Sequence, residues 1–226
     1  MLEQFDVARE SVERTRSTVN YGRFQQRAFE LANSEPIRKA LDIRQESAAT
    51  RDRYGRHLFG QAALLGRRLL EAGARFVTVQ WEAPDGYSWD SHIHSNDVKS
   101  VLLPGLDQTY TAVLEDLSAR GLLDETLVVL TSEMGRTPGA NAQGGRGHWA
   151  YCFPMLFAGA GIRGGSVYGK SDKHAGYPID KPVSPADLSA TIFQSLGIDP
   201  HLRIPDPEGR PTPITEGGRP LDELFG

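Results

Sequence analysis

The sequence predicts an α/β fold in which helices flank a mostly parallel sheet. Residues 75–131 follow the order strand, helix, strand, which is the order of a βαβ unit. The run 126–131 is almost wholly apolar, as is typical of a strand covered on both faces of a parallel sheet. A length of 226 residues is sufficient for the core of one α/β domain.

The beginning of the chain, residues 1–55, predicts short charged helices. One helix is expected to start at Ser34, a capping residue that Pro36 follows in the first turn. A longer helix is predicted over 56–72, where leucine and alanine recur at helical spacing and Gly73 provides a C-cap.

The βαβ unit begins directly after this helix. Residues 75–81 are rich in β-forming residues and predict the first strand, and 82–96 form a polar loop. A second long helix is predicted over 97–120, in which Pro104 should cause a kink or a restart. The second strand is then predicted over 126–131.

The remaining residues predict a mixed C-terminal part. Residues 153–158 are expected to form another apolar strand, and 164–169 a short hairpin. A last helix should start at the capping residue Ser184 and stop at Gly197. Residues 200–226 are rich in proline, glycine and charge and are expected to cover the surface as coil.

Composition limits the class of protein. We expect one domain with a helical segment (1–55), an α/β core that carries the site (56–200) and a C-terminal tail (201–226). Hydrophobic residues make up 39% and the net charge is −4, which is typical of a globular protein and argues against nucleic-acid binding. No apolar stretch is long enough for a transmembrane helix, and residues 1–10 lack the apolar region of a signal peptide. Cys152 is the only cysteine, which excludes an internal disulfide, and is predicted to be a small core residue.

Polar side chains gather after the two strands of the βαβ unit. Asp90 and His92 lie in the first loop, and Glu133, Arg136 and His148 lie beyond the second strand. Ligands of open α/β sheets bind outside the carboxyl ends of the strands, so these loops are the candidate site. Carboxylate and imidazole two residues apart suit a divalent cation such as Zn²⁺.

Each of these residues also has a simpler interpretation. Asp90 and His92 could form an ordinary turn with a surface histidine, and Glu133 could cap a turn instead of acting as a ligand or general base. Arg136 could hold an anionic substrate group or form a salt bridge to Glu133 or Asp90. His148 could serve loop packing. Asn141 and Thr137 are interpreted as turn residues.

Several motifs together carry a family resemblance. They are W-D-S-H at 89–92, E-M-G-R-T-P at 133–138 with Asn141, G-R-G-H-W at 145–149, G-I-R-G-G at 161–165, G-K-S-D at 169–172 and P-V-S-P-A-D at 182–187. In this order and spacing the chain resembles the bacterial domain-of-unknown-function family 1501 (DUF1501) from about residue 20 to residue 200. That family is placed in the alkaline phosphatase superfamily, which includes phosphatases, sulfatases and phosphoglycerate mutases.

The resemblance implies an alkaline-phosphatase-like parallel sheet with two divalent ions at its carboxyl edge. Asp90 and His92 resemble the Asp/His pair that holds one metal, and His148 resembles a later single histidine that completes a metal site. Glu133 lies where better-known superfamily members have an Asp-His pair. Met134 replaces the histidine of that pair, which puts the second metal site in doubt.

The resemblance also implies that part of the fold is missing. Superfamily members carry an early aspartate ligand and the nucleophile near the N-terminus, where this chain has charged helices and no candidate nucleophile. We therefore expect the C-terminal part of a longer, exported (periplasmic) protein, without its N-terminal strands and signal segment. The unpaired sheet edge would then favour association of copies.

The expected function is metal-dependent hydrolysis of a small anionic phosphate or sulfate ester. The metal would be Zn²⁺, or Ca²⁺, Mg²⁺ or Mn²⁺, held by Asp90, His92, Glu133 and His148. Glu133 and Arg136 would act in catalysis, as ligand or base and as anion clamp. The alternatives are a metal-binding or structural module without catalysis, and an α/β domain whose polar loops only pack.

Overall fold

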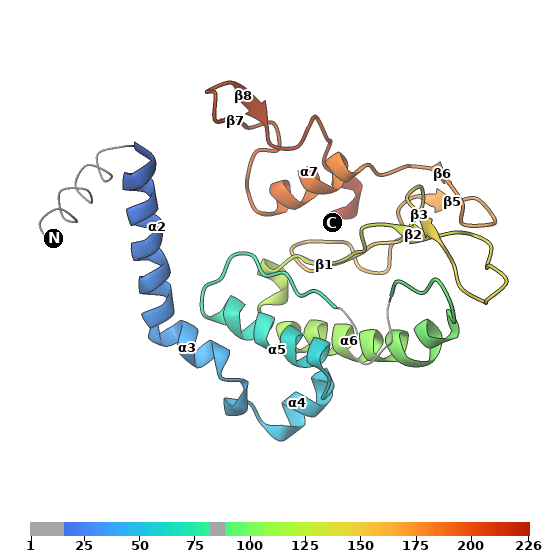
Figure 1. Ribbon diagram of the computed structural model, residues 1–226, viewed down its shortest axis with the longest axis horizontal. Coiled ribbons are helices and arrows are strands. Elements are labelled where there is room, and N and C mark those ends of the chain that lie inside the picture. Colours follow the sequence, from blue (N-terminus) through green and yellow to red (C-terminus); the bar gives the residue numbers. More distant parts are fainter. Residues whose placement is uncertain (1–15, 82–88) are drawn as a thin grey trace, which may run out of the picture. The chain divides into compact units, whose positions relative to one another are not determined.

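The computed structural model describes residues 16–81 and 89–226 and divides the chain into two compact units, Met1–Trp81 and Glu82–Gly226 (Figure 1). The boundary lies inside the range 56–200 that the sequence predicts as one core. The described helices of the first unit are α2 (Arg16–Asn33), α3 (Glu35–Leu41), α4 (Ala48–Tyr54) and α5 (Leu58–Glu71), with a 3-10 turn at Ile43–Gln45.

The predicted start of α3 and the predicted ends of α5 are confirmed to within two residues, whereas α2, with 18 residues, is longer than the short helices expected there. Helix α3 begins after Ser34, with proline in its first turn, although the Ser34 side chain makes no capping hydrogen bond. Helix α5 begins after His57, whose Nδ1 accepts a hydrogen bond of 3.2 Å from the backbone N–H of Gly60. Beyond its C-terminus Gly73 adopts a φ of 97°, the left-handed conformation that favours glycine.

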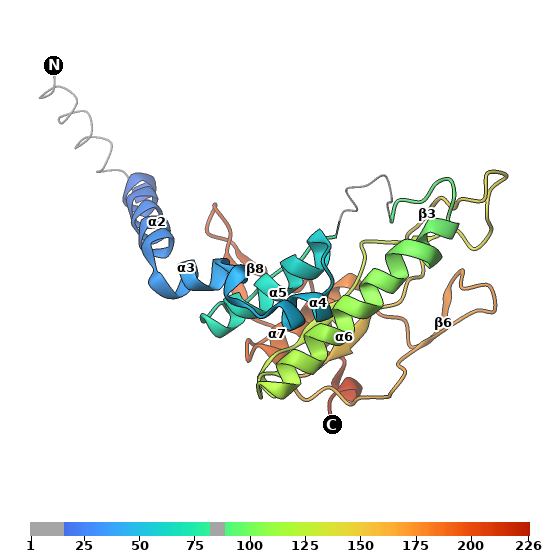
Figure 2. The same ribbon diagram turned by 90° about the horizontal axis from the view of Figure 1, so that it is seen from below.

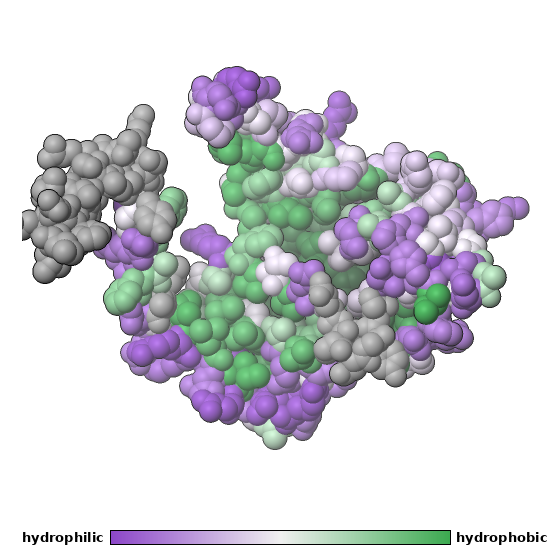
Figure 3. All heavy atoms as spheres, viewed as in Figure 1, coloured by the Kyte–Doolittle hydropathy of each residue, from purple (hydrophilic) through white to green (hydrophobic). Residues whose placement is uncertain are grey.

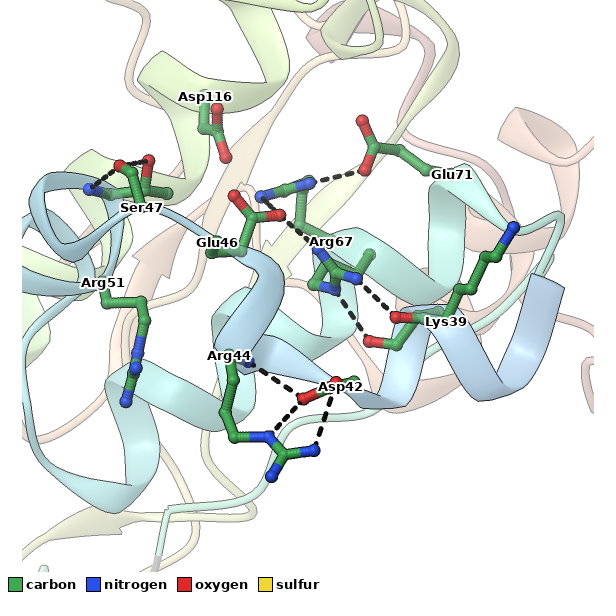
Figure 4. Close-up of polar contacts among 12 residues, drawn as sticks. Lys39, Asp42, Arg44, Glu46, Ser47, Arg51, Arg67, Glu71 and Asp116 are labelled. Carbon is green, nitrogen blue, oxygen red and sulfur yellow. Dashed lines mark hydrogen bonds and ion pairs between the residues drawn. The ribbon is translucent and has the colours of Figure 1, made fainter. Parts of the chain in front are cut away.

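A buried ion-pair cluster ties α5 to the preceding turn (Figure 4). Oε1 of Glu46 lies 2.8 Å from Nη2 of Arg67 and 2.5 Å from Nη1 of Arg68, and Arg67 also contacts Glu71 at 2.5 Å. The Arg67 side chain is only 1% exposed, so its charge depends on these carboxylates. Burial disfavours the charged form of Glu46, but hydrogen bonds from Arg68 and Arg67 outweigh burial and hold its pKa below the usual value.

Residues 75–81 do not form the predicted strand. Val77 and Val79 instead pack on α5 at Gly66, where an added methyl group would lie 3.3 Å from each valine side chain. A β-rich run becomes a strand only when a partner pairs with its backbone, and composition does not show the partner.

The second unit contains two longer helices. A π-helical turn at Val98–Leu102 continues directly into α6 (Leu103–Ala119; Figure 2), with Pro104 in the first turn of α6, so the helix changes its hydrogen-bond pattern at the predicted position but does not restart there. Helix α7 (Pro185–Ser195) has the predicted cap, in which Ser184 and Asp187 exchange hydrogen bonds with each other's backbone N–H. Short 3-10 turns occur at Leu123–Glu125 and Asp222–Leu224.

The strands of the described residues form four antiparallel pairs. The pairs are β1 (Val128–Leu130) with β4 (Leu156–Ala158), β2 (Gly135–Arg136) with β3 (His148–Trp149), β5 (Lys170–Ser171) with β6 (Pro178–Asp180), and β7 (Arg203–Pro205) with β8 (Pro211–Pro213). The prediction of an α/β, alkaline-phosphatase-like fold with a mostly parallel sheet is therefore wrong. The apolar runs 126–131 and 153–158 do contain strands, but they pair with each other in antiparallel register.

Two further predictions for the C-terminal part are corrected. Residues 164–169 form no hairpin; the hairpin follows them as β5 and β6, after Gly169 with its φ of 76°. The tail 200–226 is not all coil, because it contains β7 and β8.

Cys152 is half-buried and not a core residue. Within 16–81 and 89–226 no helix has the length and apolar content of a membrane span, as predicted.

The surface of the second unit is not uniformly polar. Figure 3 shows a hydrophobic area below the polar tip formed by β7 and β8. Exposed apolar side chains between the end of α7 and the middle of β7 are Leu196, Ile198, Leu202 and Ile204.

Replacement of Glu46 should destabilise the protein strongly. In Glu46→Ala the 1%-exposed Arg67 loses the carboxylate of Glu46, which we expect to cost about 3–5 kcal/mol in the free energy of unfolding. Urea denaturation measures this change. The matched control is Glu35→Ala, which removes an exposed ion pair with Lys39 and should leave the midpoint unchanged. Equal midpoints for the two variants would contradict the assigned role of Glu46.

The contribution of Glu46 to the free energy of unfolding should depend on pH. The pKa of Glu46 is lower in the folded than in the unfolded chain, so the unfolded chain takes up a proton first as the pH falls. The stabilisation is therefore complete above about pH 4.3 and decreases below it. The difference in unfolding free energy between wild type and Glu46→Ala should shrink below that pH; a difference that grows there would refute the interpretation.

Candidate metal centre

Three side chains converge on one point of the second unit. Nε2 of His148 lies 2.8 Å from Oδ1 of Asp90, Nε2 of His92 lies 3.0 Å from the same oxygen, and the two Nε2 atoms are 3.0 Å apart. Among the described residues this is the one group of His, Cys, Asp and Glu side chains with the spacing of a metal site. The three side chains are about half exposed, at 56%, 52% and 50% for Asp90, His92 and His148.

The hairpin β2–β3 supplies His148 and Arg136 together. These two residues are directly opposite each other in the antiparallel register, so their side chains share one face of the hairpin. Nη2 of Arg136 reaches Oδ1 of Asp90 at 2.8 Å and the backbone oxygen of Trp89 at 2.8 Å. Of the two interpretations of Arg136, the structure shows the salt bridge, and its partner is Asp90.

Glu133 lies apart from this group. Its side chain is exposed in the turn that precedes β2, where Oγ of Ser132 donates a hydrogen bond of 2.7 Å to the backbone oxygen of Met134. It does not belong to the group that Asp90, His92 and His148 form in the described residues. The structure thus brings together three of the four predicted ligands.

The opposite face of the β2–β3 hairpin is packed by aromatic rings. Trp149 contacts Tyr151 and Tyr177 with ring centroids 5.1 Å and 5.5 Å away, and its Nε1 donates a hydrogen bond of 2.6 Å to the backbone oxygen of Gly176. These contacts hold the hairpin beside β5 and β6 (Figure 1). Since successive residues of a strand face opposite sides, Trp149 anchors the strand that presents His148.

Backbone contacts join the loop of His92 to the loop of His148. The backbone N–H of Arg146 donates to the oxygen of Ser91 at 3.0 Å, and the N–H of Ser95 donates to the oxygen of Gly144 at 3.1 Å. Between these bonds the two chains are so close that a Cβ on Gly145 would lie 1.8 Å from the backbone oxygen of His92. Only glycine fits at this position.

Two further residues, Asn141 and Arg146, stabilise the loop of His148 by hydrogen bonds within that loop. Oδ1 of Asn141 accepts hydrogen bonds from the backbone N–H groups of Gln143 and Gly145, at 3.0 Å and 2.9 Å. Nη1 of Arg146 donates to the backbone oxygens of Thr137 and Pro138, at 2.6 Å and 2.5 Å. Sequence reasoning interpreted Asn141 only as a turn residue and assigned nothing to Arg146; the dense G-G-R-G-H motif was the available signal.

The electrostatics of the group keep its carboxylate charged. Hydrogen bonds from His148 and Arg136, together with the nearby charges of His92 and Arg136, lower the pKa of Asp90 to about 2. Asp90 is thus available as an anionic ligand at any ordinary pH.

The donor set fits a small divalent ion. In a tetrahedral shell with bonds of about 2.0 Å, ligand atoms lie about 3.3 Å apart. The observed separations of 2.8–3.0 Å are slightly shorter, so the ligands need to move apart by only a few tenths of an ångström. Two imidazoles and one carboxylate are a common ligand set of catalytic zinc sites, which leave a position open for water or substrate.

Comparison with known proteins places the chain in a family. The family described as protein of unknown function (DUF1501) matches residues 1–225, and the chain belongs to it. No curated protein and no solved structure is detectably similar to the chain.

The approach of Gly145 to His92 can be tested by adding a single methyl group. Gly145→Ala should clash with the backbone oxygen of His92 and lower the free energy of unfolding by about 1–3 kcal/mol or more. Gly139→Ala in the same loop is the matched control, because an added Cβ there has no neighbour within 4 Å. Chemical denaturation measures both variants. Equal stability of the two would show that the loops do not approach as described.

Proposed function

We propose that this DUF1501 protein is a metal-dependent hydrolase of small phosphate or sulfate esters, with its ion held by Asp90, His92 and His148. The convergence of one carboxylate oxygen and two imidazole nitrogens within 3.0 Å of one another is the observation that carries the proposal. From the alkaline phosphatase superfamily the proposal takes the chemistry alone, because the strands of the described residues pair only in antiparallel register.

Zinc is the ion that the ligands favour. Imidazole suits Zn²⁺ and other transition ions, whereas Ca²⁺ and Mg²⁺ prefer sites made of oxygen atoms. When bound, such an ion supplies Lewis acidity towards an ester oxygen and lowers the pKa of water. The half-exposed position of the three side chains gives a small substrate access from solvent.

Arg136 is the residue that we assign to substrate binding. Its guanidinium lies 2.8 Å from Oδ1 of Asp90 and is therefore beside the ion that Asp90 would hold. A planar guanidinium matches the paired oxygens of a phosphate or sulfate group. In this proposal Arg136 orients the anionic ester, and Glu133 has no part in holding the ion.

The second candidate function is a metal-binding or structural module without catalysis. The position of Glu133 favours a module without catalysis. Glu133 is the predicted general base, but its side chain is exposed and lies outside the ligand group of the described residues. The two candidates share the metal centre and differ in turnover.

Metal content tests the site itself. The purified protein should bind Zn²⁺ stoichiometrically, and His92→Ala and His148→Ala should each abolish stoichiometric binding, because only two ligands of the group remain. The matched control is His201→Ala, since His201 is exposed and outside the ligand group. Elemental analysis after dialysis gives the measurement. Absence of metal in the wild type, or unchanged metal in both site variants, would disprove the proposal.

Turnover separates the two candidates. An aryl phosphate and an aryl sulfate should be hydrolysed by the zinc-loaded protein but not by His92→Ala, and Arg136→Ala should raise KM because the anion loses its clamp. The released phenol is measured by absorbance. Bound metal without hydrolysis of either ester would favour the module without catalysis.

Association of copies is also a proposal. The short two-stranded sheets have outer edges through which strands of another copy could pair. Light scattering tests it, and a monodisperse monomer would contradict it.

A further inference from the structure

Asn141 contacts both loops of the metal centre through one side-chain amide. Its Nδ2 donates a hydrogen bond of 2.8 Å to the backbone oxygen of His92, a proposed ligand. Its Oδ1 accepts from Gln143 and Gly145 on its own loop. The donor half of the amide therefore serves the loop of His92, and the acceptor half serves the loop that leads to His148.

A turn residue would need only the acceptor half. An aspartate or serine can accept hydrogen bonds from the backbone N–H groups of the residues that follow it in a turn. The donor contact is made 49 residues away in sequence and does nothing for the local turn. It is directed at the backbone of the ligand residue itself, whereas the backbone bonds of Ser91 and Ser95 flank that residue.

The contact fixes the backbone from which the His92 side chain projects. The side chain is about half exposed, so packing restrains it little, and its direction depends on the backbone from which it projects. That backbone lies against Gly145 on one side and accepts the Asn141 amide. Partners that orient ligands from outside the coordination shell commonly change metal affinity by about 10–100-fold.

We propose that Asn141 is a positioning residue of the metal centre, which holds His92 in register with His148 and Asp90 through its Nδ2–H. The inference rests on the proposed metal site and adds to it a residue that touches neither ion nor substrate.

The decisive variant is Asn141→Asp. Aspartate keeps both acceptor contacts, to Gln143 and Gly145, but replaces the donation to His92 by a carboxylate oxygen that the His92 carbonyl repels. Its added negative charge by itself attracts a cation, so a fall in metal affinity must come from the altered contact with the His92 backbone. We expect the Zn²⁺ dissociation constant to rise by about 10–100-fold in Asn141→Asp and in Asn141→Ala.

The measurements are zinc affinity by competition with a chromophoric chelator, the visible spectrum of the Co²⁺-substituted protein, and thermal unfolding without metal. A positioning role predicts weaker affinity and altered Co²⁺ absorption in Asn141→Asp, with a metal-free melting temperature close to that of the wild type. The matched control is Asn96→Ala. Asn96 is an exposed residue of the His92 loop, and its side chain makes no hydrogen bond within 16–81 and 89–226.

The outcomes separate this inference from the proposed function. If the wild type binds Zn²⁺ and Asn141→Asp binds it equally or more tightly, the positioning role is refuted and the metal site stands. If the wild type does not bind Zn²⁺ or Co²⁺, both fail. A lower melting temperature in Asn141→Asp with unchanged affinity would show a structural role only and would also refute the inference.

Discussion

The close approach of Gly145 to the backbone oxygen of His92 is the constraint on which the candidate metal centre depends. A Cβ at residue 145 would lie 1.8 Å from that oxygen, so the absence of a side chain lets the two loops touch. The hydrogen bonds of Arg146 to Ser91 and of Ser95 to Gly144 form on either side of this point. Of the three proposed ligands, only His148 lies in a strand. The backbone hydrogen bonds between the loops bring Asp90 and His92 to the same position.

Charged groups serve different purposes in the two units. In the first unit Arg67 is 1% exposed and paired, so its charge contributes to a fixed arrangement of α5 and the preceding turn. In the second unit Asp90, His92 and His148 are about half exposed, so their burial stabilises the fold little. The convergence of three such groups within 3.0 Å of one another therefore adds little stability, and it is the observation on which the proposed metal site rests.

Helix boundaries were predictable because their causes are local. The change of helical hydrogen bonding before Pro104, the cap of Ser184 and Asp187 and the left-handed Gly73 each depend on residues within one or two turns. The sheet was not predictable in this way. The apolar run 126–131 predicts a strand, but whether its partner is parallel or antiparallel depends on residues far along the chain. The observed partner, β4, begins at Leu156.

The sequence by itself determined which residues could serve as ligands, because the chemistry of carboxylate and imidazole is a property of the side chains. It left the partners open. The tertiary structure decided that Asp90, His92 and His148 meet, that Arg136 pairs with Asp90, and that Glu133 lies outside the group of the described residues. It also gave Asn141 a contact with the loop of His92. The physical reason is separation along the chain: Asp90 and His148 are 58 residues apart, and only the pairing of β2 with β3 and the approach of two loops at a glycine bring them together.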